Sequence, residues 1–274
     1  GPDGIPFGAY RMFSDLAGPI LHEVMLALAA GQTPPLGYNY ALLYLLPKKL
    51  TMLIQDTRPI SVTNADNRII ARFMVNTIIE PIKARLHPAQ KGSIRGYQGQ
   101  DHVRELTELF YSAVEDETLN YHVLFADTKK AFDSIHHRFI FAALGRIGLP
   151  LWVIRVMRGL LDRVAATPVF GAYSGVWISI TRGVKQGCPT SPLIFAICID
   201  VLVVRLSRVA HVRVWAYVDD IAIGCTQVRG FSACMTIMDK FSLASGLGLN
   251  RQKTKIISAK HDPDVDVWLT TRDC

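Results

Sequence analysis

The stretch that decides the fold is VRVWAYVDDIAIG, residues 212–224, in which two adjacent aspartates stand between two short apolar runs. The apolar runs predict two strands of a hairpin, with Val218, Asp219 and Asp220 at its tip. Adjacent carboxylates repel each other unless a cation neutralises them. Turn aspartates often only cap backbone amides, but that role accounts poorly for a pair between two such strands. We therefore expect the tip of this hairpin to bind metal.

A third aspartate, Asp127, ends an earlier apolar run that begins at Tyr121. If its strand lies beside the hairpin, the three carboxylates form a holder for two divalent ions. We expect Asp127 and Asp219 to bridge the ions, and Asp220 to be a looser ligand or an orienting group. Mg²⁺ prefers oxygen ligands and keeps some of its waters, so few carboxylates suffice; Mn²⁺ is an alternative ion. Two such ions activate an attacking hydroxyl and hold a triphosphate, which predicts nucleotidyl transfer.

Composition and charge fit a globular protein with a polyanionic partner. The chain has 274 residues, 50% of them hydrophobic, which is ample for a packed core. The net charge is +7, and residues 45–104 contain ten Lys or Arg against four Asp or Glu. This basic block is explained either by solvated helix faces or by a surface that faces phosphates.

The cysteines and the apolar segments indicate an intracellular protein. The five cysteines form no Cys-x-x-Cys pair, which favours reduced, buried thiols over a zinc site or a disulfide framework. No signal peptide is evident. The longest apolar stretch, residues 192–204, is too short to span a bilayer and contains Asp200. We therefore expect no membrane partner.

The order of the predicted elements mixes helices with mainly antiparallel strands, which predicts the α+β class. Asn64 and Asp101 are each expected to cap a helix. Pro81 is expected to kink or break the helix that Asn64 caps. The segment from residue 261 is expected to be a polar, frayed tail. The predicted strands are 41–46 (buried), 60–62, 121–127, 164–170, 176–180, 212–217, 221–224 and 254–258. The predicted helices are a first one ending near 30, then 64–86, 101–114, 134–144, 150–161, one from 190, and one ending near 246.

Several motifs together resemble one family. YVDD at 217–220 is similar to the metal-binding motif of reverse transcriptases, FADTKKAFD at 125–133 to their first aspartate motif, and RGVKQGCPTSP at 182–192 to their nucleotide-binding turn and helix. NRQKTK at 250–255 resembles their late lysine motif. Three further segments resemble the fingers of non-LTR (LINE-type) retrotransposon enzymes: GPDGIP at 1–6, LPKK at 46–49 and RPIS at 58–61.

The resemblance implies roles for residues around the nucleotide. Thr128 would offer its backbone carbonyl to a metal ion. Phe132 would lie under the sugar, where a bulky ring collides with a 2′-hydroxyl, so that deoxynucleotides are preferred. Gln186 and Gly187 would pack beside the incoming nucleotide, with Gly allowing close approach of the backbone. Ordinary core packing explains Phe132 as well, and a plain turn before a helix explains Gln186 and Gly187.

The resemblance also implies roles for basic residues. Arg58 and Lys48 would grip the triphosphate, Arg through its planar fork and Lys as a point charge. Lys49 is a nearly equal candidate for the position of Lys48. Lys253 would lie near the leaving pyrophosphate as a general acid. A solvated surface position explains each of these lysines equally well.

The implied architecture is the fingers–palm part of a right-hand polymerase, with an antiparallel palm sheet backed by helices. We expect helical, basic fingers at 1–120, a palm with the aspartates at 121–260 and a tail at 261–274. Residues 150–185 are a candidate insertion of the fingers. No thumb segment is present, so we expect a longer polyprotein with a thumb and an endonuclease, and weak binding of template and primer by this chain alone.

The implied function is RNA-directed DNA polymerisation by two-metal catalysis, with an RNA template, a DNA primer and dNTPs as partners. The location would be nucleus and cytoplasm for a eukaryotic retroelement. Three alternatives remain open: a group II intron-type reverse transcriptase, an RNA-templated RNA polymerase, and a catalytically inactive reverse transcriptase-like fragment that binds RNA or acts as a scaffold. The aromatic ring of Phe132 argues against the RNA polymerase.

Overall fold

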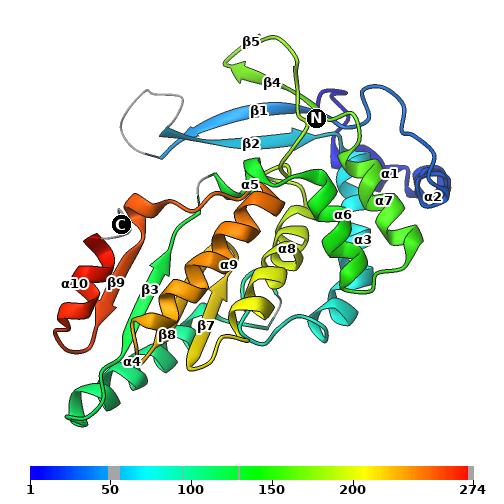
Figure 1. The fold of residues 1–274 in the computed structure, drawn as a ribbon. Coiled ribbons are helices and arrows are strands. Elements are labelled where there is room, and N and C mark those ends of the chain that lie inside the picture. The colour runs from blue at the N-terminus through cyan, green and yellow to red at the C-terminus, as the bar shows by residue number, and fades with distance from the viewer. Residues whose placement is uncertain (49–55, 95, 129, 271–274) are drawn as a thin grey trace. The chain divides into compact units, whose positions relative to one another are not determined.

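The computed structural model describes residues 1–48, 56–94, 96–128 and 130–270 (Figure 1). Two compact units share the chain: Gly1–Ile82 with Ile135–Ile194, and Lys83–Ser134 with Phe195–Cys274. This division differs from the expected fingers at 1–120 and palm at 121–260. Because compact units need not coincide with functional domains, the fingers and palm boundaries stay a prediction.

The first unit contains a five-stranded sheet with the strand order β2-β1-β4-β5, and β6 also pairs with β4. β1 runs antiparallel to β2 and parallel to β4. The sequence predicted β1 to be buried, which is wrong, since Ala41 is buried while most of the strand is half-buried or exposed. A run of apolar residues indicates a hydrophobic strand, but it does not show which face of that strand is covered by other elements. The strands are β1 (Tyr40–Pro47), β2 (Thr57–Thr63), β4 (Ala165–Phe170), β5 (Tyr173–Ser174) and β6 (Ile178–Ser179).

The helices of the first unit confirm part of the predicted pattern. Ile70, Met74 and Ile78 lie buried on one side of α3, as predicted, but Phe73 is 51% exposed. The helix also continues through Pro81 to its end at Lys83. A proline in the last turn removes only one intrahelical hydrogen bond, so no break results. The helices are α1 (Phe7–Met12), α2 (Ser14–Ala30), α3 (Ala65–Lys83), α6 (His137–Arg146) and α7 (Leu151–Leu161).

The second unit contains an antiparallel sheet with the order β7-β8-β3-β9. Side chains alternate across it, and Leu124, Ile221 and Ile223 are buried. Figure 1 shows α9 running along this sheet, as the expected sheet backed by helices requires. The elements are β3 (His122–Ala126), β7 (Val212–Tyr217), β8 (Asp220–Cys225), β9 (Lys255–Ser258), α4 (Gly99–Glu115), α5 (Ala131–Ser134), α8 (Ser191–Leu206, which begins in the first unit), α9 (Arg229–Ser245) and α10 (Pro263–Thr270).

Helix α4 covers part of the sheet through a small apolar cluster. Val123, Trp215 and Ala222 form the buried part of the cluster, and Leu106 and Phe110 of α4 pack against it. The predicted apolar face of this helix also included Val103 and Val114, which are 64% and 57% exposed. The predicted cap at Asp101 is wrong too, because the helix begins at Gly99 and Gln98 occupies the capping position.

The expected frayed tail is wrong for residues 263–270, which form α10, whereas residues 271–274 lie outside the described residues. Val265 and Trp268 of this helix are 7% and 8% exposed. The Trp268 ring packs 5.8 Å from the Phe231 ring, and its Nε1 donates a hydrogen bond to Ser232 Oγ at 3.0 Å. The apolar residues Val265, Val267, Trp268 and Leu269 do not form a clear helical stripe between the polar ones, so only the packing against α9 reveals the helix.

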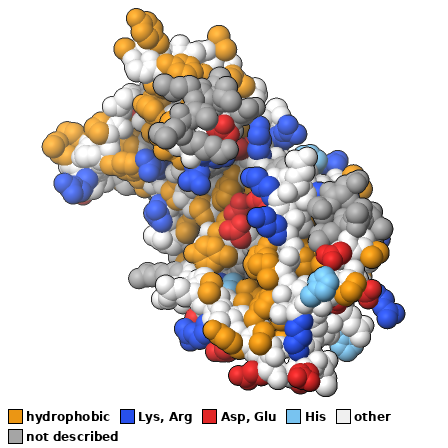
Figure 2. Space-filling model, turned by 90° about the vertical axis from the view of Figure 1, so that its left-hand side faces the viewer, with side chains coloured by type: hydrophobic (Ala, Val, Ile, Leu, Met, Phe, Trp, Pro, Cys, Tyr) orange, Lys and Arg blue, Asp and Glu red, His pale blue; other side chains and the backbone are white. Residues whose placement is uncertain are grey.

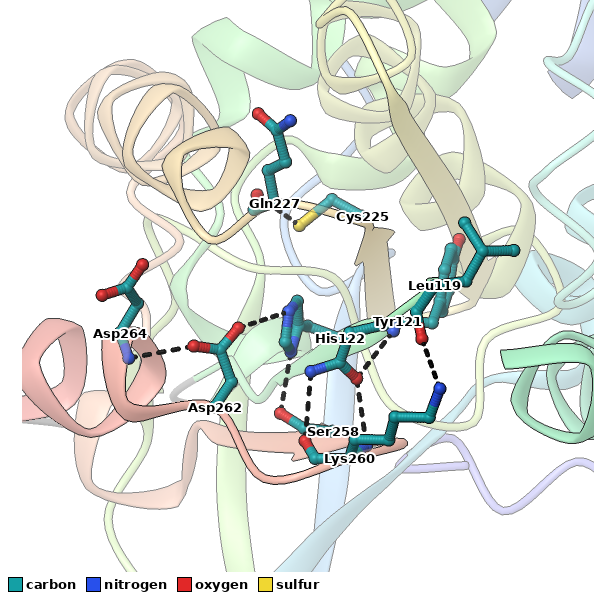
Figure 3. A network of polar contacts seen from close by, with 10 residues as sticks. Leu119, Tyr121, His122, Cys225, Gln227, Ser258, Lys260, Asp262 and Asp264 are labelled. Atoms are coloured by element: carbon teal, nitrogen blue, oxygen red, sulfur yellow. Dashed lines mark hydrogen bonds and ion pairs between the residues drawn. The ribbon is translucent and has the colours of Figure 1, made fainter. Parts of the chain in front are cut away.

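A polar network fastens the segment after β9 to the start of β3 (Figure 3). His122 Nδ1 lies 2.8 Å from Ser258 Oγ, and its Nε2 lies 3.1 Å from Asp262 Oδ2. Asn120 exchanges hydrogen bonds with the backbone of Lys260 at 3.0 and 3.2 Å. These contacts hold β9 against β3, the strand that leads to Asp127.

We predict that this network loses stability in acid. Burial lowers the pKa of His122 below its ordinary value of 6.5, although Asp262 opposes the shift. Above pH 6.5, His122 is neutral in both the folded and the unfolded state. Below pH 6.5, the unfolded state binds the proton more readily than the folded state. The free energy of unfolding therefore decreases as the pH is lowered. Urea unfolding at pH 7.5, 6.5 and 5.5 should show this loss.

The variant His122→Asn is expected to be less stable at pH 7.5 but to depend less on pH between 6.5 and 5.5. Some dependence should remain, because burial also lowers the pKa of His102 and His137. An unchanged pH dependence in the variant would show that His122 is not responsible.

The described cysteines agree with the expected buried thiols. Cys188, Cys198, Cys225 and Cys234 are free and buried, and Cys274 lies outside the described residues. Across the part of the chain that the structure describes, no helix is both long and apolar enough to cross a membrane.

Candidate active site

The candidate residues fall into two groups, one in each unit. The first unit contains the predicted nucleotide-binding residues Lys48, Arg58, Gln186 and Gly187. Lys49, the alternative to Lys48, lies outside the described residues. The second unit contains the predicted metal ligands and their neighbours: Asp127, Thr128, Phe132, Asp219, Asp220 and Lys253.

The pairing of β3 with β8 brings the distant carboxylates together. Ala126 is paired with Ile221 across the two strands, so Asp127 and Asp220 occupy the next facing positions. Facing residues on antiparallel strands have Cα atoms about 4.5–5.5 Å apart. The hairpin turn is tighter than predicted, because Asp220 pairs with Tyr217 and is already part of β8. Asp219 therefore lies in the two-residue turn, directly beside this pair.

The electrostatics of the three carboxylates fit a bound cation. Burial raises the pKa of the Asp220 carboxyl, and the negative charges of Asp219 and Asp127 raise it further. A divalent ion would relieve this repulsion, and carboxylate oxygens are the ligands that Mg²⁺ prefers. Among the described residues, however, no set of three or more His, Cys, Asp or Glu side chains is arranged as a ready metal site. The three carboxylates thus have the donor chemistry that Mg²⁺ prefers, but their side chains are not arranged around a common point in this structure.

Asp127 is held from the segment that precedes β9. Asn250 Nδ2 donates a hydrogen bond to Asp127 Oδ2 at 3.0 Å, and the Asn250 amide donates to the Asp127 carbonyl at 2.8 Å. Lys253 Nζ lies 3.7 Å from the same Oδ2, with 72% of its side chain exposed. An ion pair this exposed contributes little to stability. Asn250 was missed as a site residue, because an asparagine before a short helix is usually only a turn or cap residue.

Phe132 and Thr128 lie on the chain that leaves β3. The Phe132 ring stacks on Phe195, with ring centres 4.6 Å apart and planes 15° from parallel, and it is half-buried. Thr128 forms an antiparallel bridge with Leu249, and its Oγ1 is buried without a hydrogen-bond partner among the described residues. Phe195 thus supports the Phe132 ring from one side.

In the first unit, the turn at Gln186 and Gly187 rests on strand β2. The Ser61 amide donates a hydrogen bond to the Gln186 carbonyl at 2.7 Å. Gly187 has φ +108°, and a Cβ there would lie 2.8 Å from the Ser61 carbonyl oxygen. Both observations require glycine at this position.

Arg58 and Lys48 lie at the same end of the β1–β2 pair. Arg58 lies on β2. Pro47 and Thr57 form the last pair between β1 and β2, and Lys48 follows Pro47 directly. The Lys48 amide donates to the Asp56 carbonyl at 2.8 Å, and both basic side chains are exposed. The turn at 186–187 and Arg58 are therefore tied to one strand, which supports a shared role.

A buried lysine precedes this turn and was missed as a site residue. Lys185 is 6% exposed, and its Nζ donates hydrogen bonds to Leu160 O at 3.1 Å and Asn39 Oδ1 at 3.4 Å. Burial lowers the pKa of its ammonium group, and Cys188 opposes the shift. Lysine side chains are almost never fully buried, so from the sequence alone Lys185 would be expected at the surface.

A groove of about 390 Å³ lies beside the carboxylates in the second unit. Asp127, Asp220 and Lys253 supply charged groups to a lining that is otherwise mainly apolar. On the face drawn in Figure 2, acidic side chains are bordered by Lys or Arg and by hydrophobic side chains. The other lining residues are Gly99, His102, Val103, Leu106, Phe125, Ala126, Trp215, Tyr217, Ile221 and Ala222.

An antiparallel sheet that gathers carboxylates at the ends of two adjacent central strands, beside a groove, is typical of the polymerase palm class. The family model described as reverse transcriptase (RNA-dependent DNA polymerase) matches residues 46–266. The chain therefore belongs to the reverse transcriptase family.

Known relatives agree with this assignment. The chain is 24% identical over 265 residues to the transposon TX1 uncharacterized 149 kDa protein of Xenopus laevis, covering 93% of this chain and 20% of that protein. It is 29% identical over 211 residues to the Pol polyprotein of the type-1 retrotransposable element R2 of Popillia japonica, covering 73% and 29%. The chain thus spans less than a third of the length of these relatives. Both relatives come from transposable elements, in agreement with the resemblance to the non-LTR type.

Solved structures confirm the expected fold. A structure of telomerase from Candida tropicalis in complex with a fragment of telomeric RNA matches with a TM-score of 0.60 at 12% identity. The match covers 91% of this chain and 45% of that one. The α+β fingers–palm fold predicted from the sequence is therefore confirmed.

Proposed function

We propose that this chain is the reverse transcriptase unit of a longer non-LTR retrotransposon Pol protein and adds deoxynucleotides to a primer 3′-hydroxyl on an RNA template. The observation that supports this most is the facing of Asp127 and Asp220 across β3 and β8, with Asp219 in the adjoining turn. A protein that only binds RNA or acts as a scaffold has no need of three repelling carboxylates at one end of the sheet.

In this proposal Asp127, Asp219 and Asp220 hold divalent metal, with the Thr128 carbonyl as a further ligand. When bound, two Mg²⁺ or Mn²⁺ ions would activate the primer hydroxyl and neutralise the triphosphate. Asn250 keeps the Asp127 carboxylate in one orientation. Lys253, whose Nζ lies 3.7 Å from Asp127 Oδ2, would donate a proton to the leaving pyrophosphate.

The remaining residues select and hold the nucleotide. Arg58 and Lys48 supply positive charge for the triphosphate. Gln186 and Gly187 offer a backbone surface that is rigid because β2 supports it. Phe132, braced by Phe195, excludes a 2′-hydroxyl from the sugar position.

The template and primer would be held mainly through their phosphates, with sequence read by base pairing. The thumb and endonuclease that complete this function would lie elsewhere in the Pol protein. The free, buried thiols support an intracellular location.

The test is extension of a labelled DNA primer on an RNA template by the purified chain with dNTPs and Mg²⁺. Joining template and primer as one hairpin offsets the weak binding expected of this chain alone. We expect extension that needs Mg²⁺ and stops with a chelator. If gel shift shows that the hairpin is bound but no nucleotide is added, the proposed function is wrong.

A further inference from the structure

Gln90 is a fully buried polar side chain, 0% exposed, beside the turn that contains Asp219, and none of the quoted motifs includes it. Its Oε1 accepts hydrogen bonds from the backbone amides of Val218 at 3.2 Å and Gly92 at 2.8 Å. All four residues belong to the second unit. A side chain 128 positions away in sequence thus holds the residue that precedes Asp219.

Val218 needs such support, because its backbone has φ +59°. A β-branched residue in this left-handed region is a true outlier, and turns of this kind prefer Gly or Asn. Such conformations persist only where the surrounding structure imposes them, and they concentrate at functional sites. If Val218 relaxed, the carboxylates of Asp219 and Asp220 would turn with the backbone.

The segment that contains Gln90 is itself fixed along the outer edge of β7. Gln90 forms a parallel bridge with Ala216; the Ala216 amide donates to the Ala89 carbonyl at 2.9 Å, and the Lys91 amide donates to the Ala216 carbonyl at 3.0 Å. At Gly92, a Cβ would lie 2.0 Å from the Val218 nitrogen, so only glycine allows this approach. Backbone contacts of the residues before and after Gln90 therefore hold the Gln90 side chain next to the turn.

We propose that Gln90 is a positioning residue for the metal-binding turn: its Oε1 holds the Val218 amide and thereby fixes Asp219 and Asp220 opposite Asp127. This inference rests on the proposed function and adds to it a residue that is not among the proposed metal or nucleotide ligands. Gln90 Nε2 has no hydrogen-bond partner among the described residues. The acceptor oxygen Oε1, and not the amide nitrogen, is therefore the group that holds the turn.

The difference between the two ends of the amide defines the experiment. Gln90→Met keeps the length of the side chain but has no acceptor oxygen, whereas Gln90→Glu keeps an acceptor at the same reach. In the metal-free protein, we expect hydrogen exchange at the Val218 amide to be at least about tenfold faster in Gln90→Met, and much less changed in Gln90→Glu. This readout needs neither metal nor activity.

In primer extension, Gln90→Met should lower kcat about tenfold, consistent with the loss of one hydrogen bond that orients reacting groups. The Mg²⁺ concentration for half-maximal rate should rise about threefold or more. The KM for dNTP should stay within about twofold, because the predicted triphosphate ligands Arg58 and Lys48 belong to the first unit. Gln90→Glu should recover part of the lost kcat, because it keeps the acceptor but adds a negative charge near Asp219 and Asp220.

Asn120→Leu is a matched control. Asn120 Oδ1 also accepts two backbone amides, those of Tyr121 and Lys260, both at 3.0 Å, but at the opposite end of β3 from Asp127. Its loss should destabilise the protein to a similar degree and leave kcat and the Mg²⁺ dependence unchanged. Equal kinetic defects in Gln90→Met and Asn120→Leu would mean that Gln90 acts only on stability, and the inference would fail.

A double-mutant cycle with Val218→Asn tests the strain directly. Asn tolerates the left-handed region, so the kcat loss caused by Gln90→Met should shrink from about tenfold to about threefold in that background. An undiminished loss, or unchanged exchange at the Val218 amide, overturns the inference. A wild-type chain that binds the hairpin but extends no primer contradicts the proposed function instead, and hydrogen exchange still decides whether Gln90 braces the turn.

Discussion

Replacing Asp219 by Asn is expected to abolish primer extension, with kcat lower by about 10²- to 10⁴-fold, because a metal-ligand contact supplies several kcal/mol of charge stabilisation. The change preserves shape and removes one negative charge. Asp219 lies in the two-residue turn beside the facing Asp127 and Asp220. Single-nucleotide incorporation at saturating Mg²⁺ measures the effect, and raising Mg²⁺ further should restore little of it.

The fold should survive this substitution. Asp219 contributes to the repulsion that raises the pKa of Asp220, so Asp219→Asn is expected to leave the thermal unfolding midpoint unchanged or slightly higher. Asp264→Asn is a suitable control, since this exposed carboxylate is in the same unit but far along the chain from the turn. If Asp219→Asn keeps synthesising DNA at a normal rate, the metal site lies elsewhere.

Replacing Phe132 by Val is expected to admit ribonucleotides. Removing the ring opens space for a 2′-hydroxyl, and relief of a clash worth about 3 kcal/mol changes the ratio of kcat/KM for dNTP over rNTP by about 10²-fold. The ring is held in place by stacking on Phe195 at 4.6 Å. The measurement is single-nucleotide incorporation of dATP against ATP on the same primed RNA template.

Phe132→Tyr is the matched control, because it keeps the ring and should keep the preference for deoxynucleotides. Phe195→Leu removes the stacking partner and should weaken the preference only partly, since the Phe132 ring remains but moves more freely. Equal use of both sugars by the unmutated chain would instead favour an RNA-templated RNA polymerase.

Much of the site was predictable from local pattern. Two apolar runs around Asp219 and Asp220 predict a hairpin, and a third run predicts a strand that ends at Asp127. The four-stranded sheet confirms each of these strands. The facing of Asp127 and Asp220 was anticipated only through the order of motifs, because periodicity describes single elements and not which strands become neighbours.

The supporting residues were not predictable in this way. Asn250 contacts Asp127 from 123 positions away, and Gln90 contacts Val218 from 128 positions away. Lys185 is buried although lysine is usually exposed. Isolated polar residues have no periodic signature, and their partners are backbone groups that every residue offers.

By itself, the sequence determined most of the strands and helices, the acidic turn and the reverse transcriptase motifs, since these depend on the chemistry of neighbouring residues; the short strand β5 was not predicted. Only the tertiary structure decided that Gln90 braces Val218, that Asn250 holds Asp127 and that residues 263–270 form a helix. Those outcomes depend on hydrogen bonds and packing between segments far apart in the chain, and such contacts exist only after the chain has folded.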